Sequence, residues 1–247
     1  MRPKRPILAG LLFAAAAVLA AAQDPPVREA LKPLEPFFVR ISAYPTASLS
    51  RYDYINDIDL YEVRVYVELR RGSQEGAAVK DAIITSLGER LEFHQDHFEK
   101  RIVVDKGALP RVLGVEIAVK GRPALKETHP LPDWLVLTEP KPAVVETGKD
   151  LAVRWRFDRF AAPVDIIGYD FKTGKEFLHR TYETGASIAV PAASLPADTI
   201  VRLYIIPSWL SKRYLDGRDY ARGSEINIIP WSQVFFRTKK PGQAGTP

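Results

Sequence analysis

The chain has 247 residues, no cysteine and a formal net charge of +5, with 46% hydrophobic and 26% charged residues. This composition is typical of a globular protein that is long enough to hold a core without disulfides. The lack of cysteine excludes disulfides, thiol nucleophiles, cysteine-ligated zinc and a lipid-modified N-terminal cysteine. Three of the positive charges lie in the first five residues, which leaves about +2 elsewhere, so charge does not indicate nucleic-acid binding.

The N-terminal residues have the pattern of an export signal. Three of the first five residues are basic, and an uncharged apolar segment follows from Ile7 to Ala20. The small residues Ala20–Ala22 fit a cleavage position, and the apolar segment is shorter than the roughly 20 residues that a membrane-spanning helix needs. We expect a signal peptide over residues 1–22, with an uncleaved N-terminal anchor as the alternative.

Export of a chain without cysteine favours a bacterial origin. Secreted eukaryotic proteins of this length usually carry disulfides, and neither Asn56 nor Asn227 lies in a glycosylation sequon. No later segment is long and apolar enough to span a bilayer. We predict an exported bacterial protein, periplasmic or extracellular, with no transmembrane segment in the mature chain.

The first half of the chain has the pattern of a β-sandwich. Residues 23–36 contain four prolines and predict an extended linker. Leu60–Arg70 then alternates apolar and polar residues with the period of a half-buried strand. Short strands, frequent turn signals and no long amphipathic helix predict a β-sandwich domain over residues 37–138. The other segments expected here are strands at Phe37–Ala43, Ala82–Ser86, Arg90–Phe93, Phe98–Val104 and Val112–Lys120, a loop at Tyr44–Ile58, a short apolar segment at Trp134–Thr138, and a helical turn at Ala77–Ile84 as the alternative to a strand.

Apolar and polar residues alternate more clearly in the second half of the chain. In Leu151–Phe157 the apolar residues, including Trp155, fall on one strand face, and we expect Trp155 to anchor a core. Pro230 lies inside the apolar segment Ile226–Thr238, where it predicts a bulge or an edge because proline cannot donate to a strand ladder. The expected domain spans residues 139–238, begins at the junction Glu139–Pro142, and precedes a disordered tail at 239–247. Its other expected strands are Val164–Phe171, Glu176–Thr181, Ser187–Val190 and Thr199–Ile206.

Residues 140–238 resemble a fibronectin type III domain. The resemblance is carried by Leu151-x-Val153-x-Trp155, by Tyr169 on the following strand, and by Leu195-Pro196-x-x-Thr199-x-Val201-x-Leu203. It implies an immunoglobulin-like sandwich with Trp155 in its core. Such domains usually have an aromatic residue where this chain has Val201, so the usual hydroxyl-to-backbone tie at that corner would be absent. The family serves as spacer, binder and enzyme accessory alike, so it does not name a function.

One connection is long enough to suggest a binding site. Pro207–Glu225 joins the last two expected strands, and loops of more than about 12–15 residues are uncommon unless they are functional or disordered. Aromatic side chains interleaved with cations suit stacking on rings and pairing with anions. The alternative is that Trp209 and Leu210 cap the core while the charges are solvated. The candidate binding residues are Trp209, Lys212, Arg213, Tyr214, Arg218, Tyr220 and Arg222.

Other clusters have weaker patterns. His94-Gln95-Asp96-His97 contains potential zinc ligands, but alternation on a strand points His97 away from His94, which favours a polar hairpin. The segment Tyr44–Tyr61 is rich in tyrosine and aspartate, and it fits either a cation or partner site or an ordered loop on the sandwich. No catalytic motif for a serine hydrolase, zinc protease or nucleotide-binding enzyme occurs.

The sequence therefore predicts an all-β protein with two tandem immunoglobulin-like β-sandwich domains after a signal peptide. We expect a non-catalytic interaction or scaffold protein that needs no cofactor or metal and binds an unknown protein or envelope polymer, not nucleic acid, through its end loops. A carbohydrate- or envelope-polymer-binding module is the alternative. A hydrolase with an unrecognised site is the second alternative.

Overall fold

The computed structural model describes residues 34–52, 55–141, 144–157, 163–208 and 211–242. The expected signal peptide, the linker up to residue 33 and the tail beyond Gly242 lie outside these residues. The described residues form eighteen strands and two 3-10 helices, so the all-β prediction is confirmed. No helix among them is long and apolar enough to cross a membrane. Glu35–Pro247 forms one compact unit.

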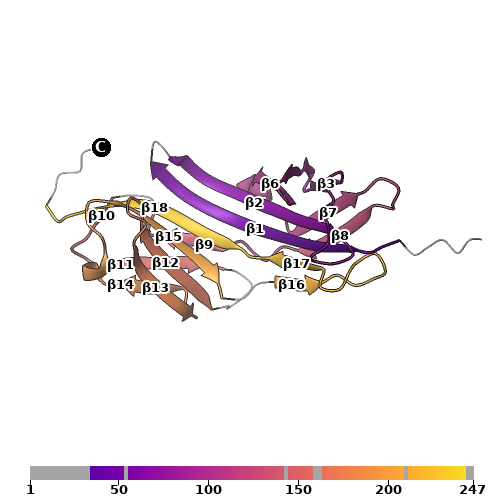
Figure 1. Cartoon of the computed structure of the whole chain (residues 1–247). Coiled ribbons are helices and arrows are strands. Elements are labelled where there is room, and N and C mark those ends of the chain that lie inside the picture. The colour runs from indigo at the N-terminus through magenta and orange to yellow at the C-terminus, as the bar shows by residue number, and fades with distance from the viewer. Residues whose placement is uncertain (1–33, 53–54, 142–143, 158–162, 209–210, 243–247) are drawn as a thin grey trace, which may run out of the picture. The chain divides into compact units, whose positions relative to one another are not determined.

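Eleven of the strands make one large sheet, in which β1 and β2 form a long antiparallel hairpin (Figure 1). The order is β13-β12-β15-β18-β1-β2-β6-β5, while β10 pairs with β18, and β17 pairs with both β1 and β16. The bounds are β1 Phe37–Tyr52, β2 Ile55–Arg71, β5 Glu92–His94, β6 His97–Val104, β10 Val144–Glu146, β12 Val164–Asp170, β13 Glu176–Glu183, β15 Ile200–Pro207, β16 Ser211–Tyr214, β17 Glu225–Ile228 and β18 Trp231–Lys239.

Strand β1 has two successive neighbours on one edge. Its first half pairs with β17 as far as Ala43, and its second half pairs with β18 from Thr46 onward. Pro45 and Pro230 both lie where one neighbour gives way to the other, so neither proline removes a donor from a regular ladder. The bulge or edge predicted at Pro230 is instead a break between two strands, because β17 ends at Ile228 and β18 begins at Trp231.

Two smaller sheets lie beside hydrophobic clusters. One has the order β4-β3-β7-β8 and the other β14-β11-β9. Their strands are β3 Ile83–Ser86, β4 Glu89–Arg90, β7 Val112–Ala118, β8 Leu125–Pro130, β9 Val136–Glu139, β11 Leu151–Arg156 and β14 Ser187–Val190. The 3-10 helices are η1 Lys106–Ala108 and η2 Ala192–Ser194.

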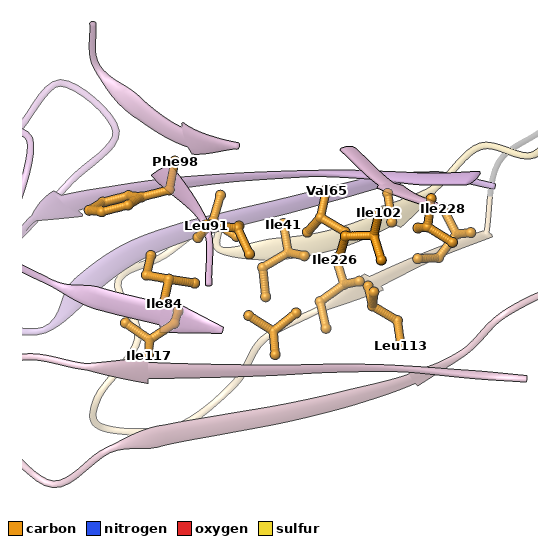
Figure 2. Close-up of a cluster of buried hydrophobic side chains, with 14 of the residues drawn as sticks. Ile41, Val65, Ile84, Leu91, Phe98, Ile102, Leu113, Ile117, Ile226 and Ile228 are labelled. Carbon is orange, nitrogen blue, oxygen red and sulfur yellow. The ribbon is translucent and has the colours of Figure 1, made fainter. Parts of the chain in front are cut away.

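The first cluster is filled by branched side chains from both ends of the chain. Figure 2 shows Ile41 and Val65 of the large sheet together with Ile84 and Ile117 of the β4-β3-β7-β8 sheet. Ile226 of β17 belongs to the same cluster. Alternation therefore places one face of β1 and β2 in this cluster, as predicted for Leu60–Arg70. Some residues of the other face, such as Phe38 and Glu62, are also buried but do not belong to the cluster.

The second cluster lies between β12, β15 and β18 of the large sheet and the β14-β11-β9 sheet. It contains Val153, Leu203 and Phe236, each fully buried. Trp155 is 7% exposed and belongs to this cluster, so its predicted core position is confirmed. Strand β11 alternates buried and exposed residues throughout, as expected for Leu151–Phe157.

Both clusters lie on the same face of the large sheet. Residues paired across neighbouring strands share a face. Ala47 of the first cluster pairs with Ser232, which flanks the buried Val234 of the second cluster at alternate positions on β18. We call the opposite face of the large sheet the open face, because none of the described sheets packs on it.

Two of the expected segments are wrong, and the two-domain division stays a prediction. The loop expected at Tyr44–Ile58 is wrong, because residues 44–52 continue β1 and residues 55–58 begin β2. The helical turn considered for Ala77–Ile84 is wrong, because Ala78 bridges to Arg70 and Ile83 begins β3. The two-domain division stays a prediction, and strand pairing between β1 and β18 crosses it.

Candidate binding face of the large sheet

The connection that the sequence singled out is partly a strand. Residues Ser211–Tyr214 form β16, which pairs with β17, so the structureless 19-residue loop is wrong. Trp209 lies outside the described residues. Lys212 Nζ lies 2.6 Å from Glu225 Oε2, and Lys212 also lies 4.7 Å from the ring centre of Tyr214.

Glu127 of β8 gathers two more of the candidate residues. Arg213 Nη2 lies 2.5 Å from Glu127 Oε2 and donates to the Thr128 carbonyl at 3.2 Å. The Tyr220 hydroxyl donates to Glu127 Oε1 at 2.5 Å, and burial together with this hydrogen bond raises the pKa of Tyr220. These contacts tie the connection to the β4-β3-β7-β8 sheet.

The remaining candidates point to solvent. Tyr214 is 59% exposed, Arg222 is exposed, and the Arg218 side chain is 92% exposed with Asp219 Oδ2 at 3.8 Å. The structure therefore separates paired residues from exposed ones within the predicted site. Its binding role stays a proposal.

A serine and a histidine meet under this connection. His129 Nε2 and Ser211 Oγ are 3.0 Å apart, and His129 is 8% exposed. Burial and the nearby Arg213 charge lower the pKa of His129. A serine nucleophile needs a base that a third group orients. His129 Nδ1 is buried and has no hydrogen-bond partner among the described residues, so the pair lacks that third group.

The segment His94–His97 forms the tight β5–β6 hairpin, with Gln95 at φ +52. His97 Nδ1 lies 3.1 Å from Asp96 Oδ1, and its Nε2 lies 3.4 Å from Glu99 Oε2. Burial lowers the pKa of His97, but these two carboxylates outweigh it and raise that pKa overall. The described residues contain no group of three or more potential ligands that could hold a metal ion.

The open face carries the side chains that the sequence reading passed over. Tyr204 pairs with Gln233, Arg202 pairs with Phe235, and Tyr44 pairs with Arg64, so these residues project from one face. Between them lies a hollow of about 410 Å³, which we call the aromatic groove. It is lined by Tyr44, Arg64, Tyr66, Arg202, Tyr204, Ile206, Ile229 and Trp231.

Aromatic rings contact one another along this groove. Tyr204 and Trp231 meet edge to face with ring centres 6.4 Å apart, and Tyr44 and Tyr66 do so at 5.5 Å. Tyr169 stacks on Tyr204 at 5.7 Å with 17° between the planes, and the Tyr204 hydroxyl donates to the Tyr169 hydroxyl at 3.4 Å. This hydrogen bond, with burial as the second cause, raises the pKa of Tyr169 to about 12. Ring contacts of this kind hold the aromatic faces in place.

Arg202 lies among these rings with a neutral hydrogen-bond partner. Its guanidinium carbon is 5.3 Å from the ring centre of Tyr204 and 5.9 Å from that of Trp231. Its Nε donates to Gln233 Oε1 at 3.0 Å, and Gln233 Nε2 donates to Ser48 Oγ at 2.8 Å. Burial and the charge of Arg64 lower the pKa of Arg202. Within the described part of the chain, no carboxylate lies within ion-pair distance of Arg202.

A second, more charged hollow of about 290 Å³ shares Arg64 and Tyr66 with the aromatic groove. Arg64 Nε lies 2.9 Å from Glu62 Oε1, and Arg101 pairs with the other oxygen of the same carboxylate. Burial lowers the pKa of Arg64, but the Glu62 contact raises it overall. We call this the charged hollow, and it is lined by Arg64, Tyr66, Glu92, His94, Glu99, Lys100 and Arg101.

Sequence reasoning missed this face because it followed the buried positions. The same alternation that placed Val201, Leu203 and Ile205 inside put Arg202 and Tyr204 on the other side. One signal was present, since both Thr199–Ile206 and Leu60–Arg70 carry an arginine and a tyrosine two residues apart at outward positions. Only strand pairing through β18 and β1 brings the two together.

Comparison with known proteins adds little. No family model matches the chain, and no curated protein matches it. Similar solved structures include fibronectin(III)-like modules of Clostridium thermocellum CbhA, with a TM-score of 0.29, 12% identity, and 85% of this chain and 98% of that chain covered. Others are the Yersinia pseudotuberculosis adhesin InvE (0.23; 10%; 80% and 58%) and a Bacteroides ovatus mixed-linkage glucan utilization protein, SGBP-B, in complex with a heptasaccharide (0.24; 9%; 81% and 60%). Similarities with TM-scores this low support no conclusion about the function of this chain.

Proposed function

We propose that this protein is an exported, non-catalytic module that binds a sugar chain on the open face of its large sheet. The observation that supports the proposal is the aromatic groove, where Arg202 lies beside Tyr204 and Trp231, and Tyr44 lines the same hollow. Binding sites for small ligands are concave and largely apolar, with a few fixed polar groups. Aromatic faces with hydrogen-bonding side chains suit the flat apolar faces and hydroxyl groups of sugar rings.

The position of the groove favours a sugar over a peptide strand. Peptides often bind by adding a strand to a free sheet edge, where backbone groups are unpaired. The groove lies on the face of β15, β18, β1 and β2, which are interior strands of the sheet. It therefore offers ring faces, guanidinium groups and hydroxyls, while the backbone of these strands is engaged in ladders.

The test is affinity electrophoresis and calorimetry of the mature protein against a panel of soluble neutral and acidic polysaccharides. We expect at least one polysaccharide to bind, and Trp231→Ala to weaken that binding at least tenfold. Tyr44→Ala provides a second probe of the groove should Trp231→Ala fold poorly. The matched control is Tyr214→Ala, an aromatic residue that is 59% exposed outside the groove.

Two results contradict the proposal. One is an absence of retardation on every polysaccharide of the panel. The other is equal loss of binding in Tyr214→Ala and Trp231→Ala, which places the contact in the connection or makes it nonspecific.

Partner binding through residues 207–225 is the second candidate. The exposed Tyr214, Arg218 and Arg222 favour it, since side chains of this kind are enriched in protein interfaces. A pull-down from a bacterial envelope tests this candidate. A partner retained by the wild type and lost on Tyr214→Ala with Arg222→Ala supports it, and equal retention by both proteins rejects it.

A further inference from the structure

We infer that the sugar chain held by the aromatic groove is acidic, and that Arg202, helped by Arg64, binds the carboxylate of a uronic acid residue. The inference rests on the proposed function, because it names the ligand class of the same groove. It commits to carboxylate-bearing polysaccharides and not to neutral ones.

Arg202 has no carboxylate partner among the described residues. Its Nε donates a hydrogen bond to Gln233 Oε1 at 3.0 Å. No carboxylate of the described residues lies within ion-pair distance of the Arg202 guanidinium group. Arg202 is half-buried, and removing a charge even partly from water without a partner is unfavourable. Rings of Tyr204 and Trp231 stabilise the cation partly but cannot neutralise it. The groove therefore holds a positive charge that a ligand carboxylate would neutralise.

Arg64, which lines both hollows, shares its carboxylate partner with a second arginine. Among the described residues, Glu62 is the carboxylate that pairs with Arg64 and also with Arg101, so one carboxylate faces two guanidinium groups. The charge of Arg64 also lowers the pKa of Arg202, which agrees with two like charges near one another. An anion between Arg64 and Arg202 would relieve this repulsion.

The Arg202 side chain is held in place within the protein. Its Nε donates to Gln233 Oε1 at 3.0 Å, and Gln233 is itself held because its Nε2 donates to Ser48 Oγ at 2.8 Å. A planar guanidinium group held by its Nε keeps its terminal nitrogens for a bidentate contact with a carboxylate. Less side-chain freedom is then lost when the ligand binds.

The arrangement of the two hollows favours a ligand of several sugar units. The charged hollow shares Arg64 and Tyr66 with the aromatic groove, so an occupant can extend from one hollow into the other. Glu92 and Glu99 line the charged hollow, but each has a partner, since Lys100 Nζ lies 2.8 Å from Glu92 Oε1 and His97 Nε2 lies 3.4 Å from Glu99 Oε2. These paired groups can still hydrogen-bond the hydroxyl groups of further sugar units. These features favour a polymer over a single uronic acid.

The test compares each acidic polymer with its neutral form. Calorimetry would use polygalacturonate, alginate and hyaluronate, each beside the same polymer with its carboxyl groups esterified or reduced. We expect at least one acidic polymer to bind about tenfold or more tightly than its neutral form, and more weakly as salt increases. Arg202→Gln should weaken binding to the acidic polymer about tenfold or more and leave binding to the neutral form almost unchanged.

Controls separate the site from general charge effects. Arg222→Gln removes an exposed arginine outside the groove and should bind as the wild type does. Arg64→Gln gives a second reading should Arg202→Gln fail to fold, as checked by circular dichroism and thermal unfolding.

The inference is overturned by equal binding of acidic and neutral forms, by unchanged affinity in both Arg202→Gln and Arg64→Gln, or by equal loss in Arg222→Gln. Binding of neutral polymers that depends on Trp231 would overturn the acidic ligand and keep the proposed function. Absence of binding to any polysaccharide overturns both.

Discussion

Arg202 on the open face and Arg213 of β16 both lie close to a tyrosine, but their charges are balanced differently. Arg213 pairs with Glu127, which also accepts the Tyr220 hydroxyl. Arg202 has Gln233 and aromatic rings as its neighbours. The first arrangement is complete within the protein, whereas the second leaves a cation for a ligand.

This difference shows what residue types alone do not reveal. Interleaved aromatics and cations were the reason to select the connection from the sequence, and the open face contains the same types at strand spacing. Whether such a group stabilises the fold or binds a ligand depends on which carboxylates the fold brings to it. Lys212 and Arg213 have their carboxylates, Glu225 and Glu127, at 2.6 and 2.5 Å.

The largest expected effect compares two tryptophans. Trp155 is 7% exposed in the second cluster, so Trp155→Ala should lower the free energy of unfolding by about 3–5 kcal/mol. Trp231 lies partly exposed on the open face, and Trp231→Ala should lower stability much less. Urea denaturation of both variants measures this. Equal destabilisation would make Trp231 a core residue and remove the contrast between the two faces.

The next effect concerns the closed arrangement at Glu127. Its side chain is 15% exposed and accepts from Tyr220 and Arg213. Glu127→Ala therefore leaves the Tyr220 hydroxyl without this acceptor and leaves Arg213 Nη2 with the Thr128 carbonyl. We expect a loss of about 1–3 kcal/mol in unfolding free energy. Glu116→Ala on neighbouring β7 is the matched control, because its side chain is 46% exposed and pairs with Lys126 at 3.4 Å. Such exposed pairs contribute only about 0–1 kcal/mol. Similar losses in the two variants would reject a structural role for Glu127.

The sequence was sufficient for strands whose buried face is strongly apolar. Leu60–Arg70 and Leu151–Phe157 were predicted correctly because valines and Trp155 alternate with charged residues. It was insufficient for residues 44–52, which were predicted as part of a loop because the segment is rich in tyrosine and polar residues. These residues stay in β1 because β2 and β18 pair with the strand from both sides. Local composition does not record such long-range pairing.

The same limit explains the missed site. Arg64 and Arg202 are 138 positions apart in sequence, and the parallel pairing of β1 with β18 places their strands in one sheet. The fibronectin-like pattern around Trp155 described the core and gave no information about the opposite face. A site formed by outward residues of several strands can be recognised only after the strand order is known.

The smallest expected effect compares two histidines in opposite environments. Asp96 and Glu99 raise the pKa of His97, whereas burial and Arg213 lower the pKa of His129. NMR titration should therefore place the native pKa of His97 above that of an unfolded histidine, near 6.5, and that of His129 below it. The stabilisation from His97 is complete below its unfolded pKa and is lost as pH rises through its native pKa. The contribution of neutral His129 is present above its unfolded pKa and is lost as pH falls through its native pKa. His97→Gln should flatten the decline of the unfolding free energy as pH rises. His129→Gln should flatten its decline as pH falls. Identical native pKa values for His97 and His129 would contradict the different environments described for the two residues.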